Sequence, residues 1–156
     1  MATGKRTYLV VIDDSKEARV ALRFAARRAA KTGGAIEVLA ITEAQEFVQW
    51  GGVQAAMEEE QQLRIEARVA AALGDLPGID GMKPDAILLQ PGEPVAVVRE
   101  IVSRRDDIAA LVLGAAPAGD PGPLVTAFSG NDAGRLPCPV MVIPGGLSDE
   151  RLEALS

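Results

Sequence analysis

The chain has 156 residues, carries a formal net charge of −6 and contains no histidine. A length of this order suits one compact domain with a buried core. The absence of histidine excludes Ser–His and Cys–His nucleophilic catalysis and any metal site built on imidazole. The acidic balance, without a dense stripe of lysine and arginine, argues against nucleic acid as a partner.

The single cysteine, Cys138, cannot form an internal disulfide, and so we expect a reducing, cytoplasmic setting. We interpret its thiol as a small buried apolar group rather than a reactive one. No secretory signal opens the chain, and no apolar run approaches a membrane span, so we expect no membrane partner. We predict one domain over residues 1–156, with flexible tails at 1–6 and 146–156.

The first predicted strand covers residues 8–12, a continuous apolar run rich in β-branched side chains, as in strands buried on both faces. Ser15 or Asp14 can cap the helix that follows. Its apolar residues recur at helical spacing, and Gly33-Gly34 ends it.

A second apolar run predicts a strand over residues 35–42. After a polar stretch that holds Phe47 and Trp50, a long helix is expected to begin near the acidic run 58–60, where the helix dipole favours negative charge. Residues 85–90 predict a third strand.

Pro94 suits the first position of a third helix, because it needs no N–H there. Residues 108–113 predict a fourth strand, and a loop rich in glycine and proline follows. A short helix over about 124–134 and a fifth strand over 139–143 complete the pattern. Strands that alternate with helices predict an α/β fold with parallel strands. Ligands of such sheets bind beyond the carboxyl ends of the strands.

Four short motifs lie at those strand ends in a fixed order. They are Asp13 and Ser15 after the first strand, Gly92-Glu93-Pro94 before the third helix, Leu111-Val112-Leu113-Gly114 at the fourth strand, and Leu136-Pro137-Cys138-Pro139-Val140 at the entry to the last strand. Together they resemble the universal stress protein family. The resemblance implies a Rossmann-like, adenine nucleotide alpha hydrolase-like fold. It has a five-stranded parallel sheet of order 3-2-1-4-5 and helices on both faces.

In that order the fifth strand lies at an edge, where an apolar strand is an aggregation hazard unless it is covered. The resemblance implies a homodimer in which this strand pairs with its twin, and closed two-fold pairs are the commonest oligomers. The alternative is that the C-terminal tail covers the edge. The expected interface residues are Val140, Met141, Val142 and Ile143.

Members of this family that bind ATP hold adenine and ribose near the first two strands, and the phosphates on a Gly-x2-Gly-x9-Gly-Ser/Thr loop after the fourth. The resemblance therefore implies a nucleotide site at Asp13, Ser15, Ile41, Gly92, Gly114, Ala115, Thr126, Ser129 and Gly130. Simpler interpretations also stand. Asp13 can form a turn or cap a helix, Ile41 can pack in the core, and Gly114 can serve the turn.

The phosphate loop departs from the family pattern. Pro117 stands at the second glycine position, and about Ala127 at the third. Pro117, Pro121 and Pro123 have no N–H to offer a phosphate, and Asp120 adds negative charge. We therefore predict that ATP does not bind in the family's usual way. An adenine nucleotide held differently, another small ligand, or no ligand remain open, and we expect no enzyme, with weak ATPase activity not excluded.

Two rival folds lack their chemical parts. A receiver domain would use Asp13-Asp14 for Mg²⁺, but it also needs an aspartate after the third strand and a lysine after the fifth, where Gln90-Pro91 and Pro144 stand. An adenylating or dinucleotide enzyme would need a glycine-rich or serine-rich loop after the first strand. The main alternative to ligand binding is an interaction module, with a protein partner at the second helix or at the loop that holds Phe47 and Trp50.

Overall fold

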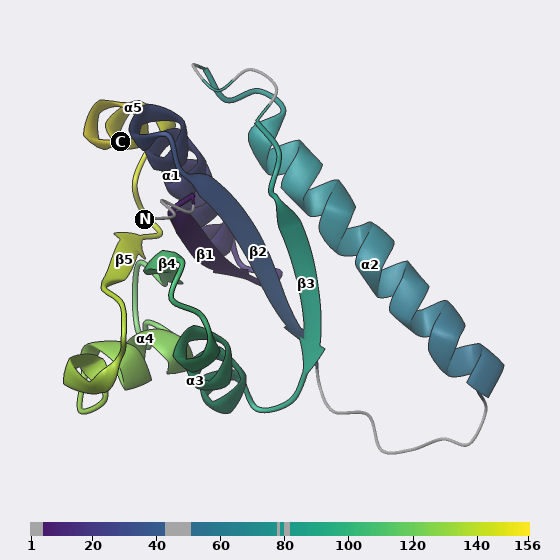
Figure 1. The fold of residues 1–156 in the computed structure, drawn as a ribbon. Coiled ribbons are helices and arrows are strands. Elements are labelled where there is room, and N and C mark those ends of the chain that lie inside the picture. The colour runs from purple at the N-terminus through teal and green to yellow at the C-terminus, as the bar shows by residue number, and fades with distance from the viewer. Residues whose placement is uncertain (1–4, 43–50, 78, 80–81) are drawn as a thin grey trace.

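The structure is a computed structural model that describes residues 5–42, 51–77, 79 and 82–156, with residues 51–54 described by their backbone alone. Strands and helices alternate along the chain (Figure 1). In order they are β1 (Thr7–Ile12), α1 (Lys16–Thr32), β2 (Ala35–Thr42), α2 (Gly51–Leu73), β3 (Ala86–Pro91), α3 (Pro94–Arg104), β4 (Ile108–Ala115), α4 (Pro123–Ser129), the 3₁₀ turn η1 (Ala133–Arg135), β5 (Val140–Pro144) and α5 (Asp149–Leu155).

The five strands form one parallel sheet in the order β3-β2-β1-β4-β5, which confirms the predicted order. Val10 of the central strand lies opposite Val38 on one side and Val112 on the other. A receiver domain has the different order 2-1-3-4-5, so the topology rules that alternative out.

Both faces of the sheet are covered, because successive side chains of a strand point to opposite faces. Val10 belongs to the core beneath α1, α2 and α5, whereas Leu9 belongs to the core beneath α3 and α4. Figure 1 shows these two helical layers on either side of the strands. Both residues are fully buried, which explains why β1 reads as a continuous apolar run. Within the described part of the chain, no helix is long and apolar enough to cross a bilayer.

Helix α1 begins and ends where its sequence predicts. The hydroxyl of Ser15 accepts a hydrogen bond from the N–H of Ala18 at 3.2 Å and so caps the first turn. Gly33 ends the helix in the left-handed conformation, with φ 72°, and its N–H donates to the carbonyl of Ala29. These caps fix where the turn between β1 and α1 lies at the edge of the sheet.

Two helices differ from prediction. Helix α2 begins at Gly51, before the acidic run 58–60 that we expected to open it. The helix predicted over 124–134 is interrupted, because α4 ends at Ser129 and the separate turn η1 follows. Gly130 is the C-cap of α4, and it has the φ −103°, ψ −127° backbone that no α-helix adopts.

Most of the tail over 146–156, which we expected to be flexible, is helical in the structure. Asp149–Leu155 form α5, and Leu152 is only 1% exposed where this helix packs against α1. The guanidinium of Arg27, buried in α1, donates from Nε to the hydroxyl of Ser156 at 2.7 Å. The tail is therefore held on the α1 face, and no described residue pairs with the outer edge of β5.

An ion network joins β2 to the start of β4 at the amino end of the sheet. Arg105 donates from Nη2 to Glu37 at 3.1 Å and from Nε to Asp107 at 2.9 Å. The Arg105 hydrogen bond holds the pKa of Asp107 below its ordinary value, and the two carboxylates raise the pKa of Arg105. This network lies at the opposite end of the strands from the predicted ligand site.

Candidate functional site

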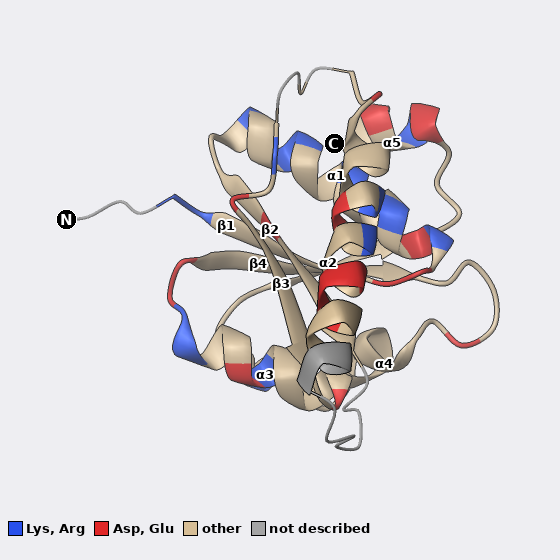
Figure 2. Cartoon of the chain, turned by 90° about the vertical axis from the view of Figure 1, so that its right-hand side faces the viewer, with Lys and Arg blue, Asp and Glu red and all other residues tan. Residues whose placement is uncertain are grey.

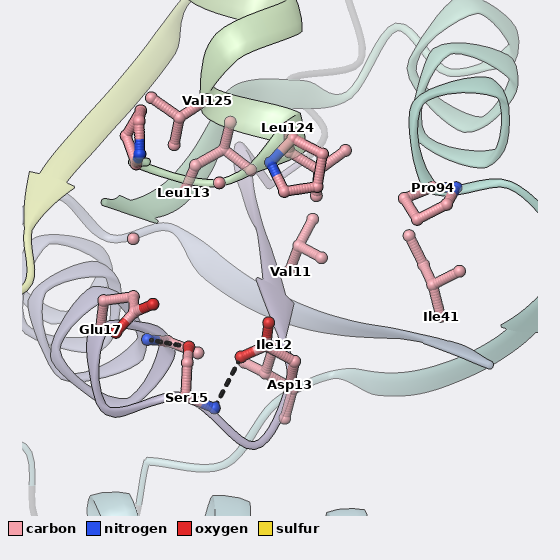
Figure 3. Close-up of a pocket in the computed structure, with 15 residues that line it drawn as sticks. Val11, Ile12, Asp13, Ser15, Glu17, Ile41, Pro94, Leu113, Leu124 and Val125 are labelled. Atoms are coloured by element: carbon pink, nitrogen blue, oxygen red, sulfur yellow. Dashed lines mark hydrogen bonds between the residues drawn. The ribbon is translucent and has the colours of Figure 1, made fainter. Parts of the chain in front are cut away.

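A cavity of about 170 Å³ opens at the carboxyl ends of β1 and β4, where parallel sheets bind their ligands. Strands β1, β2 and β4 contribute its floor, the first turn of α1 one wall, and the loop that enters α4 another (Figure 3). Its lining residues include Val11, Ile12, Asp13, Ser15, Glu17, Ile41, Pro94, Leu113, Gly114, Leu124 and Val125. Most of these are apolar, and Asp13, Ser15 and Glu17 supply the polar groups.

Asp13 occupies the turn between β1 and α1. Its Oδ1 accepts a hydrogen bond from the N–H of Ser15 at 2.8 Å, the pattern by which an aspartate side chain closes a turn. No described residue hydrogen-bonds its other carboxylate oxygen, and the side chain is exposed. The turn therefore uses one oxygen of Asp13 and leaves the second available to a ligand.

Ile41 lies near the end of β2 and lines the cavity beside Pro94 (Figure 3). It also packs against the core beneath α3 and α4. Ile41 therefore packs in the core and also lines the cavity, as a half-buried side chain at a strand end can.

Gly114 is needed for space rather than for a turn. It lies inside β4 without a positive φ, and a Cβ there would stand 2.2 Å from the carbonyl oxygen of Glu17. Gly145 is similar, because a Cβ there would stand 2.5 Å from the Glu17 Cβ. The two glycines let the first turn of α1 rest directly on the ends of β4 and β5.

The loop after β4 satisfies part of its own backbone. The Oδ1 of Asp120 accepts from the N–H of Gly122 at 2.9 Å, and Ala116 donates to the carbonyl of Pro121 at 3.2 Å. Gly122 has φ 118°, a conformation that favours glycine, and it precedes Pro123 at the start of α4. The fold of this loop places residues 121–125 along the cavity.

Four of the predicted site residues meet around the cavity, namely Asp13, Ser15, Ile41 and Gly114. Ala115 follows Gly114 in β4 without lining the cavity, and Gly92 lies in the turn after β3. Thr126, Ser129 and Gly130 also lie outside the lining, because α4 begins at Pro123 and carries them away from its mouth.

Sequence reasoning missed the residues that complete the walls, which are Glu17, Pro94, Gly122 and Leu124. A local signal existed for Gly122, since glycine followed by proline suits the start of a helix. Among the described residues, no three acidic or cysteine side chains gather to hold a metal ion. Phe47 and Trp50, the predicted partner site, lie outside the described residues.

The fold and the motifs agree with comparisons to known proteins. The model of the universal stress protein family matches residues 5–144. Universal stress protein UspA from Lactobacillus plantarum superposes with a TM-score of 0.64 at 16% identity, covering 90% of this chain and 99% of its own. A protein of this family from Burkholderia pseudomallei gives 0.58 at 21% identity, covering 92% and 99%.

The universal stress protein from Archaeoglobus fulgidus in complex with dAMP gives a TM-score of 0.54 at 17% identity, covering 91% of this chain and 99% of its own. A comparison with curated proteins finds no match. Identities this low show a shared fold, and the family model shows membership. The chain belongs to the universal stress protein family.

Proposed function

We propose that this chain is a homodimeric, cytoplasmic regulatory domain, not an enzyme, that binds an adenine-containing ligand in the cavity at the ends of β1 and β4. The observation that carries the proposal is the second carboxylate oxygen of Asp13, which has no partner among the described residues and stands at the rim of an apolar cavity. The dAMP bound by the similar protein from Archaeoglobus fulgidus supports the adenine class.

The chemistry of the cavity suits a purine nucleoside. Val11, Ile41 and Leu124 offer apolar surface to a flat ring, and ligand pockets combine such walls with a few placed polar groups. A carboxylate such as that of Asp13 accepts hydrogen bonds from a ribose hydroxyl or an exocyclic amine. The lining of the cavity therefore suits one adenine ring against its apolar residues and one polar contact from Asp13.

The loop after β4 supports a ligand without a triphosphate cradle. Three of its residues, Pro117, Pro121 and Pro123, have no N–H. The N–H of Gly122 donates to the Asp120 carboxylate, an anion within the loop to which the family resemblance assigns the phosphates. We therefore infer that the family's phosphate loop is degraded in this chain and that the nucleoside part provides most of the affinity.

Titration calorimetry with adenosine tests this site. We expect binding to the wild-type protein, and a loss of affinity of about tenfold in Asp13→Asn, because a hydrogen bond to a charged group contributes about 1.5–3 kcal/mol. Asp106→Asn is the matched control, since Asp106 is exposed at the other end of the sheet. Equal affinity in Asp13→Asn, or no adenosine binding by a folded dimer, would overturn the proposal and favour an interaction module.

The dimer proposal has its own support in β5. The outer edge of this strand is unpaired among the described residues, and Val142 is 37% exposed on it. Val140 and Met141 are half-buried, and Ile143 is buried. An apolar edge with free backbone groups favours pairing with a second strand. The twin strand of another copy supplies such a partner through a closed two-fold contact.

A further inference from the structure

A second hollow adjoins the cavity at the turn between β1 and α1, where the two share Ile12, Asp13 and Ser15. Two adjoining cavities of about 460 and 320 Å³ share Asp13, Asp14 and Ser15 in their walls. One extends beneath α2 toward the ends of β2 and β3, and the other runs between α1 and α2. We refer to both together as the α1–α2 groove.

Basic residues outnumber acidic ones in this groove. Lys16, Arg19 and Arg68 line the cavity between α1 and α2, and Arg64 lines the one beneath α2, against the carboxylates of Asp13 and Asp14 that both cavities share. Figure 2 shows basic segments on both of these helices. Glu60, the ion-pair partner of Arg64, adds a third carboxylate, so the groove has one net positive charge on a chain whose net charge is −6.

The two arginines of α2 are directed into the groove by helical spacing. Arg64 and Arg68 are four residues apart and so lie on the same side of the helix. Each directly precedes a core residue, Ile65 and Val69, which are buried. The arginine stems therefore begin at the border of the buried face, and the Arg68 side chain is only 35% exposed.

Both arginines have partners that a ligand can replace. Arg68 pairs with Asp14, and Arg64 lies 3.6 Å from Glu60. The Asp14 side chain is 84% exposed and that of Glu60 72% exposed, and ion pairs with such partners are weak. A phosphate group carries more charge and more acceptor oxygens than one carboxylate, and guanidinium groups bind it in bidentate fashion.

We propose that the α1–α2 groove binds the phosphate group of a small phosphorylated metabolite, with Arg64 and Arg68 as its direct ligands and Lys16 and Arg19 as flanking charges. The four cations of this site lie outside the lining of the cavity at β1 and β4 and outside the loop after β4, although the two hollows share Asp13 and Ser15. In this groove the phosphate is bound by the cationic side chains of arginine and lysine instead of by backbone N–H groups. It does not depend on whether the cavity binds adenosine.

Calorimetry with pyrophosphate as the probe tests this groove. We expect the wild-type protein to bind pyrophosphate, and Arg64→Gln and Arg68→Gln each to weaken binding about tenfold, as for loss of a charge-assisted hydrogen bond. Arg104→Gln is the matched control, because Arg104 is an exposed arginine on α3 with a similar helical ion pair. The affinity should also fall as salt is raised.

Variants of the turn separate the groove from the cavity and from loss of folding. Asp14→Asn keeps Arg68 and frees it from its carboxylate, so pyrophosphate should bind more tightly. Asp13→Asn should weaken adenosine but strengthen pyrophosphate, since it removes a negative charge from the groove. The proposal is overturned if the wild-type protein fails to bind pyrophosphate at millimolar concentration, or if the Arg64→Gln/Arg68→Gln double variant binds it as tightly as the wild type.

Discussion

Replacing Gly114 with alanine tests how closely α1 rests on β4. A Cβ at this position would lie 2.2 Å from the carbonyl oxygen of Glu17 and 2.5 Å from its carbonyl carbon. Both are backbone atoms in the first turn of α1, so no side-chain rotation can relieve the overlap. Either the helix or the strand has to move, and the turn that carries Asp13 moves with the helix.

The cost follows from two opposing effects. Overpacking a core costs about 1–3 kcal/mol, and a clash with backbone belongs at the upper end of that range. Alanine in place of glycine returns about 0.4–1 kcal/mol, because the unfolded chain has less entropy to lose. We therefore expect the free energy of unfolding to fall by about 2 kcal/mol. With a urea m value of about 2 kcal/mol/M, the unfolding midpoint falls by about 1 M.

Urea unfolding followed by far-UV circular dichroism measures this change. Gly134→Ala is the matched control, because a Cβ there meets no atom within 4 Å and the residue has no positive φ. The control should stay within about 0.5 kcal/mol of the wild type. A Gly114→Ala midpoint equal to that of the wild type would refute the close contact between α1 and β4.

Three further changes probe the edge strand, the ion network and α5. Val142→Lys should convert the dimer to a monomer in light scattering, because it places a charge on the strand that pairs. Arg105→Gln should destabilise the protein near neutral pH. The lowered pKa of Asp107 gives a stabilisation that is full above the unfolded-state pKa near 3.9 and is lost as the pH falls through the folded-state pKa. The difference in unfolding free energy between Arg105→Gln and the wild type should therefore shrink from pH 6 to pH 3. Leu152→Ala should cost about 2–4 kcal/mol in urea unfolding, because its side chain is buried between α5 and α1.

Each change has a control of the same chemistry. Leu63→Lys alters an exposed leucine of α2 and should leave the mass unchanged. Arg104→Gln should show no loss of stability comparable to that of Arg105→Gln, and Leu155→Ala removes a leucine that is 48% exposed. An unaltered mass in Val142→Lys contradicts the β5 interface. A pH-independent difference for Arg105→Gln, or a stability for Leu152→Ala equal to that of Leu155→Ala, contradicts the corresponding contact.

The strands were the most predictable part of the fold. Residues 8–12 and 108–113 are continuously apolar because helices cover both faces of the sheet, so nearly every position is buried and only Val11 and Ala109 are half-buried. The strand order came from the family resemblance and not from periodicity. The packing of α5 could not be predicted, because its sequence is polar apart from its leucines and Arg27, which holds its end, comes from a distant part of the chain.

The candidate site was predictable only where it lies at strand ends. The place of Asp13 and Ile41 could be predicted because they lie at the ends of β1 and β2. The structure brings both residues to the cavity. Thr126 and Ser129 do not line the cavity, because α4 begins at Pro123 and the sequence alone did not fix that start. The contact of Gly114 with Glu17 joins residues far apart in the sequence, so no local pattern could reveal why glycine is required there.

Backbone amide chemical shifts, recorded during titration with adenosine and then with ATP, test most directly where the ligand lies. We predict that adenosine shifts the amides of Asp13, Ile41 and Leu124 around the cavity. Exchanging adenosine for ATP should add no shift at residues 118–120. Among the described residues, their N–H groups are the ones in the loop after β4 that are still free to bind a phosphate. The opposite result, in which ATP binds far more tightly than adenosine and shifts those loop amides most, would show that the loop still holds phosphate and would contradict the proposed function.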